Sequence, residues 1–425
     1  PRIAFLQGRV ADEIDKGEEA ERNYRRAISG DATYWEPSYY LGRFNLKRKR
    51  LDEAKVAFSE ALQKAPGRPE PHVGMGNYLL AAGTVDEAKK EFLAALEIDR
   101  EYAPGHFGLA EVLFVENAFE DAKKEYETVL ALDSTLAGAY TRYATLLWRL
   151  EDREGAVAAF EKAKSADPKG LEAIWQLGAV YFELEKYNDA VKNVEAALTI
   201  DPAHADSYFY KARIHYVRHE NTQGIEAMKA ALERASMRPH YYYWMGNILY
   251  QAQRFGEAFE NWQQAIKLDA NYADALEAVA KGHQEQTNHP EAITFYEKTL
   301  QVDPERKRLI FNIAESYFAM NQFDKAISKY QEALKADPTL VGAYFKIGRC
   351  YNEKGRLNDA VVWYQRAVKN DPEAKEVWRF LGYAYKERGK NGDATTAFEK
   401  YVELNPDAGD VPDILNEIYD LKNDR

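Results

Sequence analysis

The stretch LEAIWQLGAVYFELEKYNDAVKNVEAALTIDPAH, residues 171–204, contains the pattern that decides the fold of the whole chain. Shifted by 34 residues at a time, the sequence aligns with itself from residue 1 to residue 408 without insertion or deletion, which gives twelve copies of one unit. Counted from the start of each copy, position 8 is always Gly or Ala, and position 20 is Ala in every copy except at Gly224. Self-similarity at such a period predicts a repeat architecture, in which each copy is one supersecondary unit.

Two amphipathic helices are predicted in each copy. Apolar residues recur at i, i+3, i+4 and i+7 over positions 3–14 and again over positions 18–30, which is typical of helices with one buried face. Around position 15 the pattern breaks, often at residues that tolerate a left-handed backbone, such as Asp15, Gly83 and Asn117. Asp-Pro pairs such as Asp167-Pro168 follow the second helix, because the residue before proline avoids the helical region. Each copy is therefore predicted to be a helix–turn–helix hairpin.

Small residues at positions 8 and 20 predict that the two helices of a hairpin approach each other closely. Position 24 is usually aromatic, for example Phe160, Tyr330 and Phe398, and a large ring there would fill the space beside the small residues. One hairpin cannot bury its apolar face alone, whereas hairpins stacked in line can. The predicted fold class is therefore all-α, a superhelical solenoid of helix–turn–helix hairpins.

This signature resembles that of the tetratricopeptide repeat family. The small residue at position 8, Ala at 20, the aromatic at 24, Ala at 27 and Pro at 32 recur over residues 1–408, and the Leu-Gly pair at positions 7–8 appears as Leu177-Gly178 and Leu381-Gly382. The resemblance implies twelve tandem repeats that form a right-handed superhelix. It also implies a concave groove lined by the first helices, into which positions 2, 5, 9, 12 and 13 point.

Residues 409–425 lie beyond the last copy and do not follow the repeat pattern. They carry one apolar stripe, formed by Val411, Ile414, Leu415 and Ile418, with polar side chains on the opposite side. Solenoids need terminal elements with a polar outer face to remain soluble. The segment is therefore predicted to be a C-terminal capping helix, apolar toward the last hairpin and polar toward water.

The first helix has no comparable cap. It begins directly after Pro1, and Ile3, Phe5 and Leu6 are expected to be exposed on its surface. Because apolar side chains at the end of a solenoid are normally covered, we expect an additional domain upstream of residue 1 in the native protein.

Composition limits the classes of partner and compartment. The 425 residues include 57 Lys and Arg against 69 Asp and Glu, and the net charge of −12 argues against nucleic acid as a partner. No run of 18 apolar residues occurs, so no segment is predicted to insert directly into a membrane. The single Cys350 excludes an internal disulfide, which fits a reducing compartment. We therefore expect the protein to be cytoplasmic.

No motif in the sequence predicts enzyme chemistry. A glycine-rich phosphate loop, a nucleophile elbow and a paired-Cys metal signature are all missing. His215 and His219, spaced i, i+4 on one predicted helix, are the best metal candidates, but His215 occupies position 11, where most copies place a core residue. The interpretation is a packed histidine, and we expect no catalytic residue, no metal and no cofactor.

Large aromatic side chains recur at the groove positions 5 and 12 in the middle of the chain. From the fourth to the eighth copy they form an almost unbroken wall, joined at position 9 by polar residues that can fix a bound backbone or charge. Aromatic-lined concave surfaces bind extended peptides or helices. The predicted partner-binding residues are Phe107, Phe114, Trp148, Trp175, Phe182, Phe209, Arg213, Tyr216, Tyr243, Asn247 and Tyr250. The alternative interpretation is that these rings pack the repeats against one another.

A second candidate site is a basic patch in the second copy. Residues 1–68 contain 14 Lys and Arg against 11 Asp and Glu, whereas the rest of the chain is acidic. The members of this secondary basic patch are Arg43, Lys47, Arg48, Lys49 and Arg50. Such a run of like charges is usually a solvated turn. The alternative is a contact with an acidic partner or with a neighbouring domain.

Some tetratricopeptide repeat proteins hold a C-terminal carboxylate with five polar side chains from three successive repeats. The nearest match here uses Asn312 and Lys346, but Glu277, Lys281 and Gly342 occupy the other positions and break the set. We therefore do not expect this mode of carboxylate binding.

Taken together, these features favour a non-catalytic protein-protein interaction scaffold that binds a partner peptide, helix or domain in its concave groove. The alternative is the substrate-recruiting arm of a larger enzyme, such as a glycosyltransferase, whose catalytic part lies outside this sequence. RNA binding is the weakest interpretation, because the chain is acidic.

Overall fold

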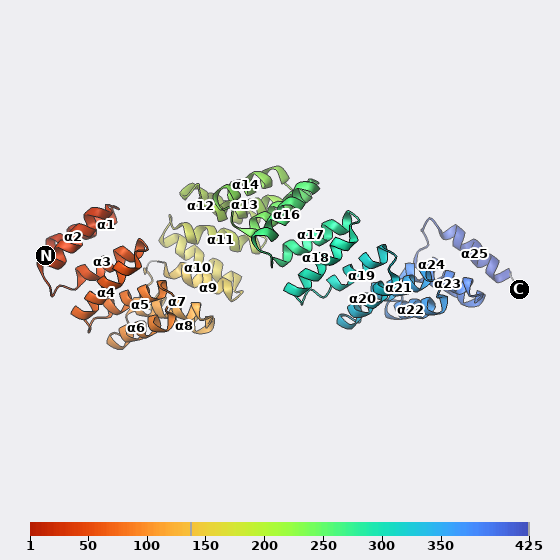
Figure 1. Cartoon of the computed structure of the whole chain (residues 1–425), viewed down its shortest axis with the longest axis horizontal. Coiled ribbons are helices and arrows are strands. Elements are labelled where there is room, and N and C mark those ends of the chain that lie inside the picture. The colour runs from red at the N-terminus through yellow and green to blue at the C-terminus, as the bar shows by residue number, and fades with distance from the viewer. Residues whose placement is uncertain (137, 424–425) are drawn as a thin grey trace. The chain divides into compact units, whose positions relative to one another are not determined.

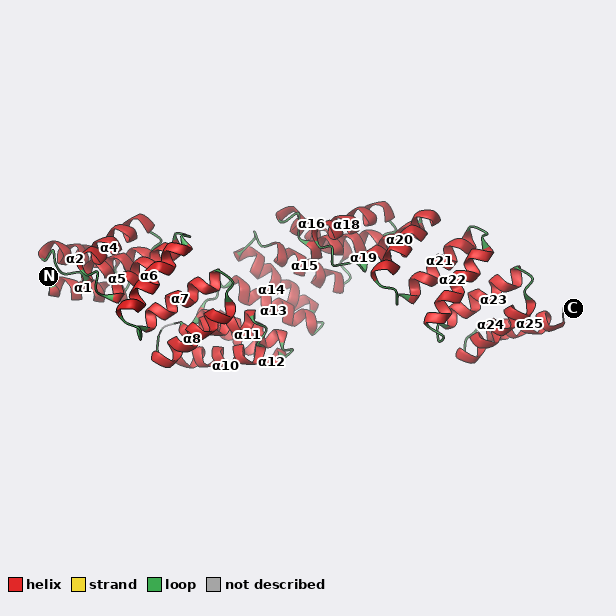
Figure 2. Ribbon diagram, turned by 90° about the horizontal axis from the view of Figure 1, so that it is seen from below, coloured by secondary structure: helices red, strands yellow, loops and turns green. Residues whose placement is uncertain are grey.

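The computed structural model describes residues 1–136 and 138–423, and within these residues it contains 25 α-helices and no strand. Short loops join the helices (Figure 2). The odd-numbered helices begin the hairpins: α1 (Arg2–Glu13), α3 (Glu36–Lys47), α5 (Pro69–Ala81), α7 (Ala103–Val115), α9 (Ala139–Arg149), α11 (Leu171–Glu183), α13 (Ala205–Val217), α15 (Pro239–Gln251), α17 (Ala273–Glu285), α19 (Leu309–Ala319), α21 (Val341–Glu353) and α23 (Lys375–Glu387). The even-numbered helices follow them: α2 (Gly17–Gly30), α4 (Leu51–Lys64), α6 (Val85–Ile98), α8 (Phe119–Leu132), α10 (Arg153–Ala166), α12 (Tyr187–Ile200), α14 (Asn221–Arg234), α16 (Phe255–Leu268), α18 (His289–Val302), α20 (Phe323–Ala336), α22 (Leu357–Asn370) and α24 (Asn391–Leu404). The last helix is α25 (Val411–Asn423).

Two compact units make up the chain, unit 1 (Pro1–Ile214) and unit 2 (His215–Arg425). Within each unit, helices that are consecutive in the sequence pack against each other as hairpins, for example α5 with α6 in unit 1 and α21 with α22 in unit 2 (Figure 1). The all-α repeat fold predicted from the sequence is confirmed. No helix of the described residues has the length and apolar composition that a membrane span requires.

The turn inside each hairpin has a left-handed backbone at one residue. Positive φ angles occur at Asp15, Lys49, Gly83, Asn117, Glu151, Glu185, His219, Gln253, Thr287, Asn321, Gly355 and Gly389, and successive members of this series are 34 residues apart. A left-handed residue directly after a helix lets the chain reverse while backbone N–H groups still reach the last carbonyls of that helix. The predicted break at position 15 is therefore confirmed.

The turn between hairpins is fixed by aspartate side chains. Asp167 and Asp371 are the C-terminal caps of α10 and α22, as the Asp-Pro pairs predict. Each carboxylate then accepts a hydrogen bond from the backbone N–H two residues later, at Lys169 and Glu373 respectively. This local hydrogen bond stabilises the turn before the next helix begins.

Close packing inside the hairpins confirms the predicted roles of positions 8 and 24. A methyl group added at Gly42 would lie 2.6 Å from the ring of Phe58, and one added at Gly348 would lie 2.5 Å from the ring of Tyr364. Such distances are below van der Waals contact, so the two helices approach this closely only because no side chain is present. Phe58 and Tyr364 are completely buried. The ring of one helix therefore occupies the space that the glycine of its partner leaves open.

Both ends of the chain differ in part from the prediction. At the first helix Ile3 and Leu6 are exposed as expected, but Phe5 is buried because its ring packs against Tyr24, Tyr34 and Tyr40. The expectation of an exposed Phe5 is therefore wrong: Tyr24 of α2, Tyr34 of the following loop and Tyr40 of α3 cover it.

At the C-terminal end, α25 buries Val411, Ile414 and Ile418, as the apolar stripe predicts, and also Leu421. Leu415 does not belong to the buried stripe, because it is 49% exposed. The buried positions are spaced i, i+3, i+7 and i+10, which is one face of a helix, and Leu415 lies beside that face rather than on it. Ile414, Ile418 and Leu421 pack against Phe398 and Tyr401 of α24.

Candidate partner-binding surfaces

The odd-numbered helices form the inner layer of unit 1. In addition to packing against their even-numbered partners, α1 contacts α3, α3 contacts α5, α5 contacts α7, and α9 contacts α11. Stacked hairpins that contact each other through their first helices curve toward that side, which becomes the concave binding surface of a solenoid. The predicted binding positions belong to these helices.

Five side chains of α11 and α13 form an aromatic cluster in unit 1. Arg213 places its guanidinium carbon 4.4 Å from the ring centre of Phe182 and 5.5 Å from those of Phe209 and Tyr210. Tyr210 in turn lies 6.2 Å from the ring of Trp175. Phe182 and Phe209 are buried, so they support the cluster from below, whereas Trp175, Tyr210 and Arg213 are partly exposed. Burial is the main reason why the pKa of Tyr210 is raised to about 12.

The other predicted residues of unit 1 make separate contacts. Phe107 packs on Tyr126, and Phe114 packs on Phe119 of α8. Trp148 donates a hydrogen bond of 2.8 Å from its indole nitrogen to Glu183, which ties α9 to α11. These three aromatic residues are partly exposed.

Three of the four predicted residues in unit 2 line one cavity. Tyr243, Asn247 and Tyr250, all on α15, face a cavity of about 390 Å³ that is also bounded by α16, α17 and the segment before α19. Asn247 accepts a hydrogen bond of 3.0 Å from the indole nitrogen of Trp262, and Tyr250 donates one of 2.7 Å to Glu285. Tyr216 lies outside the cavity and packs on Trp244.

A charged cluster closes the other side of this cavity. Glu277 is only 5% exposed. Its carboxylate oxygens form ion pairs with the side-chain nitrogens of Lys281, Arg306 and Arg308 at N···O distances of 2.7–2.8 Å. Arg306 also contacts Asp274 at 2.6 Å. The cavity wall thus combines aromatic rings with fixed charges of both signs.

Protonation in this cluster follows from its hydrogen bonds. Burial alone would raise the pKa of Glu277, but the hydrogen bonds from Lys281 and Arg306 outweigh burial, so the pKa lies below its usual value. Burial likewise opposes the charged form of Arg306, and hydrogen bonds to Asp303, Asp274 and Glu277 outweigh it and raise the pKa of the guanidinium. Glu277 and Arg306 are therefore both ionised at neutral pH.

The secondary basic patch does not form a single surface. Lys49 occupies the left-handed position of the turn, as predicted for this run. Arg48 pairs with Asp12 and Asp15, and Arg50 pairs with Glu21, so carboxylates of unit 1 neutralise both. Arg43 and Lys47 lie instead on the lining of a cavity in unit 1.

Of the two histidines singled out from the sequence, His215 is in contact with a carboxylate, and His219 occupies the left-handed position of the turn. His215 lies 2.6 Å from Glu220 through its Nδ1 atom, and it is partly buried. Over residues 1–136 and 138–423, no three or more His, Cys, Asp or Glu side chains come together in a group that can hold a metal ion.

Comparison with protein families identifies the repeat. A tetratricopeptide repeat model matches residues 2–69, 175–239, 311–375 and 363–409, which is more than half of the chain. The chain belongs to the tetratricopeptide repeat family. Further tetratricopeptide repeat models match residues 45–110, 137–169 and 246–286.

Several solved structures of helical repeat proteins are similar to this tetratricopeptide repeat chain. One is the Cut9 and Hcn1 hetero-tetramer of the APC/C, at 12% identity, a TM-score of 0.46, and coverage of 98% of this chain and 96% of that one. YrrB, described as a TPR protein with an unusual peptide-binding site, gives 24% identity, a TM-score of 0.37, and coverage of 44% and 96%. PilF of Pseudomonas aeruginosa gives 21% identity, a TM-score of 0.46, and coverage of 50% and 97%. A search of curated proteins gives no match.

Sequence reasoning missed several residues of these surfaces. Tyr210 and Trp244 occupy position 6, which is not among the groove positions carried over from the tetratricopeptide repeat family. Arg306 and Arg308 lie in the loop between hairpins, whose contacts a helical period does not predict. One feature of the sequence could have indicated the charged cluster: Glu277 is a carboxylate at position 5, where most copies have an aromatic ring.

Proposed function

We propose that the chain is a protein-protein interaction scaffold, which binds a partner peptide or helix on the inner layer of odd-numbered helices. Membership of the tetratricopeptide repeat family supports this class of function. The observation that carries the proposal is the cavity of about 390 Å³ in unit 2, in which Tyr243, Asn247 and Tyr250 meet the Glu277 cluster. No reaction is assigned to the chain.

The chemistry of the cavity suits a peptide. Two tyrosine rings offer large and rigid contact area, and aromatic residues are enriched among the side chains that dominate binding energy. The Asn247 amide and the exposed ends of Lys281 and Arg308 supply donors for backbone carbonyls and carboxylates. The volume falls in the range of about 300–1,000 Å³ that is typical of ligand sites.

Substitution Tyr243→Ala is expected to weaken partner binding about thirtyfold, which is the size of a typical hot-spot effect. The probe is a peptide selected against the whole chain from a displayed library of random sequences, and fluorescence anisotropy gives its Kd. Tyr243 is only partly buried, so the melting temperature should change much less than the affinity.

The control variant is Tyr419→Ala, because Tyr419 is an exposed tyrosine of unit 2 that does not line the cavity. It should leave both the affinity and the melting temperature unchanged. If Tyr243→Ala lowers the melting temperature strongly while the affinity of the folded protein is retained, the ring serves packing and the proposed site is wrong.

A further inference from the structure

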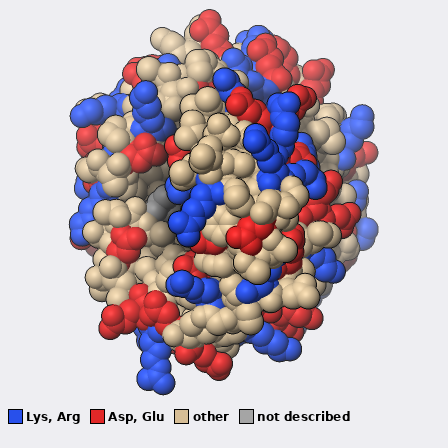
Figure 3. Space-filling model, turned by 90° about the vertical axis from the view of Figure 1, so that its left-hand side faces the viewer, with Lys and Arg blue, Asp and Glu red and all other residues tan. Residues whose placement is uncertain are grey.

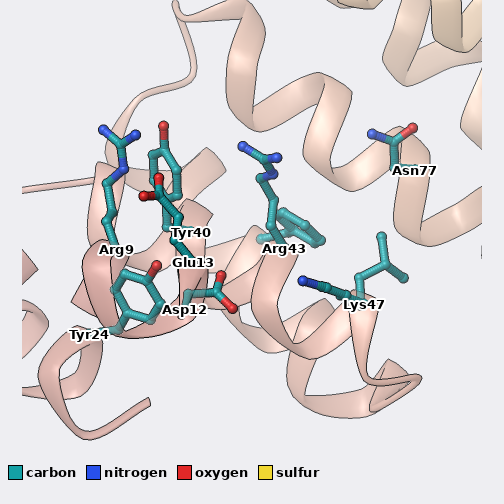
Figure 4. A pocket seen from close by; sticks show the side chains of 10 residues that line it. Arg9, Asp12, Glu13, Tyr24, Tyr40, Arg43, Lys47 and Asn77 are labelled. Carbon is teal, nitrogen blue, oxygen red and sulfur yellow. The ribbon is translucent and has the colours of Figure 1, made fainter. Parts of the chain in front are cut away.

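A second cavity, of about 550 Å³, lies between α1, α3 and α5 of unit 1, and none of the eleven predicted partner-binding residues lines it. Its lining includes Arg9 on α1, Tyr40 and Arg43 on α3, and Asn77 on α5 (Figure 4). Lys47 at the end of α3 also lines the cavity. Helices from three successive hairpins thus contribute polar side chains to one space on the inner layer.

Two arginines share one aromatic ring in this cavity. The guanidinium carbon of Arg9 lies 5.0 Å from the ring centre of Tyr40, and that of Arg43 lies 5.4 Å from the same ring. Figure 4 shows the two guanidinium groups on either side of Tyr40, pointing to the same side as its hydroxyl group. Stacking on a ring fixes a guanidinium group while leaving its N–H edge open for a two-point hydrogen bond to a carboxylate.

The cations of this cavity are not neutralised by the protein. The nearby Arg48 and Arg50 form ion pairs with Asp12 and Glu21, whereas in the described part of the chain Arg9, Arg43 and Lys47 form no ion pair with a carboxylate. Asp12 and Glu13 also line the cavity, but Asp12 is already bound to Arg48 at 3.4 Å. Three cations therefore face one unpaired carboxylate, Glu13, and the cavity keeps a positive charge.

We propose that this cavity binds an acidic segment of a partner protein, with Arg9 and Arg43 each holding a side-chain carboxylate and Lys47 adding attraction. Asn77 is placed to hydrogen-bond the backbone of that segment. These residues differ from the five polar side chains with which some tetratricopeptide repeat proteins hold a C-terminal carboxylate. The cavity instead uses arginine at position 9 of two successive hairpins, Arg9 and Arg43. The inference concerns unit 1 and does not depend on the site proposed in unit 2.

A short acidic peptide fits this surface better than nucleic acid does. In Figure 3, which faces the N-terminal end of the chain, Lys and Arg side chains are interspersed with Asp and Glu rather than gathered into a broad basic face. A phosphate backbone needs many cations along an extended track, and the net charge of −12 opposes its approach. A local pair of arginines on a surface of mixed charge selects instead a compact cluster of carboxylates.

The test measures fluorescence anisotropy of labelled hexaglutamate with the whole chain, alongside hexaglutamine and a hexanucleotide of thymidine. Hexaglutamate should bind, and its affinity should fall as salt is added, because exposed charges are screened. Arg43→Gln and Arg9→Gln should each weaken binding about tenfold, which corresponds to the loss of one charge-assisted contact. The control Arg22→Gln removes an exposed arginine of α2 that does not line the cavity and should have no effect.

Three results would overturn the inference: no binding of hexaglutamate, equal binding of hexaglutamine, or tighter binding of the oligonucleotide. A loss with Arg22→Gln as large as that with Arg43→Gln would do the same, since it would show a diffuse charge effect. Melting temperatures of the variants establish that all of them are folded. Tyr243→Ala, which alters the unit 2 cavity, should leave hexaglutamate binding unchanged. The experiment on the unit 1 cavity can therefore fail while the proposed site in unit 2 stands, and the reverse.

Discussion

Replacement of Phe92 by alanine should lower the free energy of unfolding by about 3–5 kcal/mol, because a large buried ring is removed. Phe92 of α6 is fully buried, and its ring lies against two glycines, Gly76 of α5 and Gly108 of α7. Because neither glycine has a side chain that can move into the space, the cavity left by the ring would stay empty. Urea unfolding followed by circular dichroism measures the change.

The matched control is the next residue of the same helix. Leu93 is 44% exposed, and Leu93→Ala should cost less than about 1 kcal/mol, because little apolar surface returns to water. A second arm uses Gly108→Ala, whose new methyl group would overlap the Phe92 ring and should cost about 1–3 kcal/mol. If Phe92→Ala were no more destabilising than Leu93→Ala, the ring-against-glycine packing would not be what holds these hairpins together.

Substitution Glu277→Gln is expected to lower the free energy of unfolding by about 1.5–3 kcal/mol at neutral pH, the range for hydrogen bonds to charged groups. The carboxylate of Glu277 forms ion pairs with Lys281, Arg306 and Arg308. The glutamine side chain has the same shape, but it is neutral and its amide N–H group would face these cations. Glu260→Gln, on the exposed side of α16, is the control and should change stability by less than about 0.5 kcal/mol.

The cost of Glu277→Gln should depend on pH in one direction. A lowered folded-state pKa contributes stability that is present above the unfolded value, about 4.3, and is lost as the pH falls through the folded value. The difference between the wild-type protein and the variant should therefore be constant near neutral pH and shrink as the pH falls below the unfolded value of about 4.3. A difference that does not change with pH would mean that the charge of Glu277 does not stabilise the fold.

Most of the fold could be predicted from the sequence, because it depends on contacts between residues of the same 34-residue copy. The pairing of Gly42 with Phe58 was predictable, since both positions recur in each copy at a fixed spacing. The left-handed turn was predictable at Gly83 but not at Glu185 or Gln253, which have no intrinsic preference for that conformation. At Glu185 and Gln253 the packing of the two flanking helices imposes the left-handed backbone conformation, and this packing outweighs the local preference of the residue.

The candidate sites were predictable only in part, because they depend on residues outside the period. The groove positions identified Tyr243, Asn247 and Tyr250, which do line one cavity. Arg306 comes from a loop and reaches Glu277 across 29 residues, and no spacing rule predicts where a long side chain from a loop will lie. Phe182 and Phe209 were predicted as binding residues, but neighbouring rings and Arg213 cover them.

Hydrogen–deuterium exchange of the whole chain tests most directly whether a partner binds at the unit 2 cavity, which α15 and α17 line. The exchange is measured with and without a peptide selected against the chain, because a bound ligand slows local opening of the elements that it contacts. We expect slower exchange in α15 and α17, whose side chains line the unit 2 cavity, and unchanged exchange in α14 and α18. Protection confined to α14 and α18, which do not line this cavity, would place the partner elsewhere and contradict the proposal.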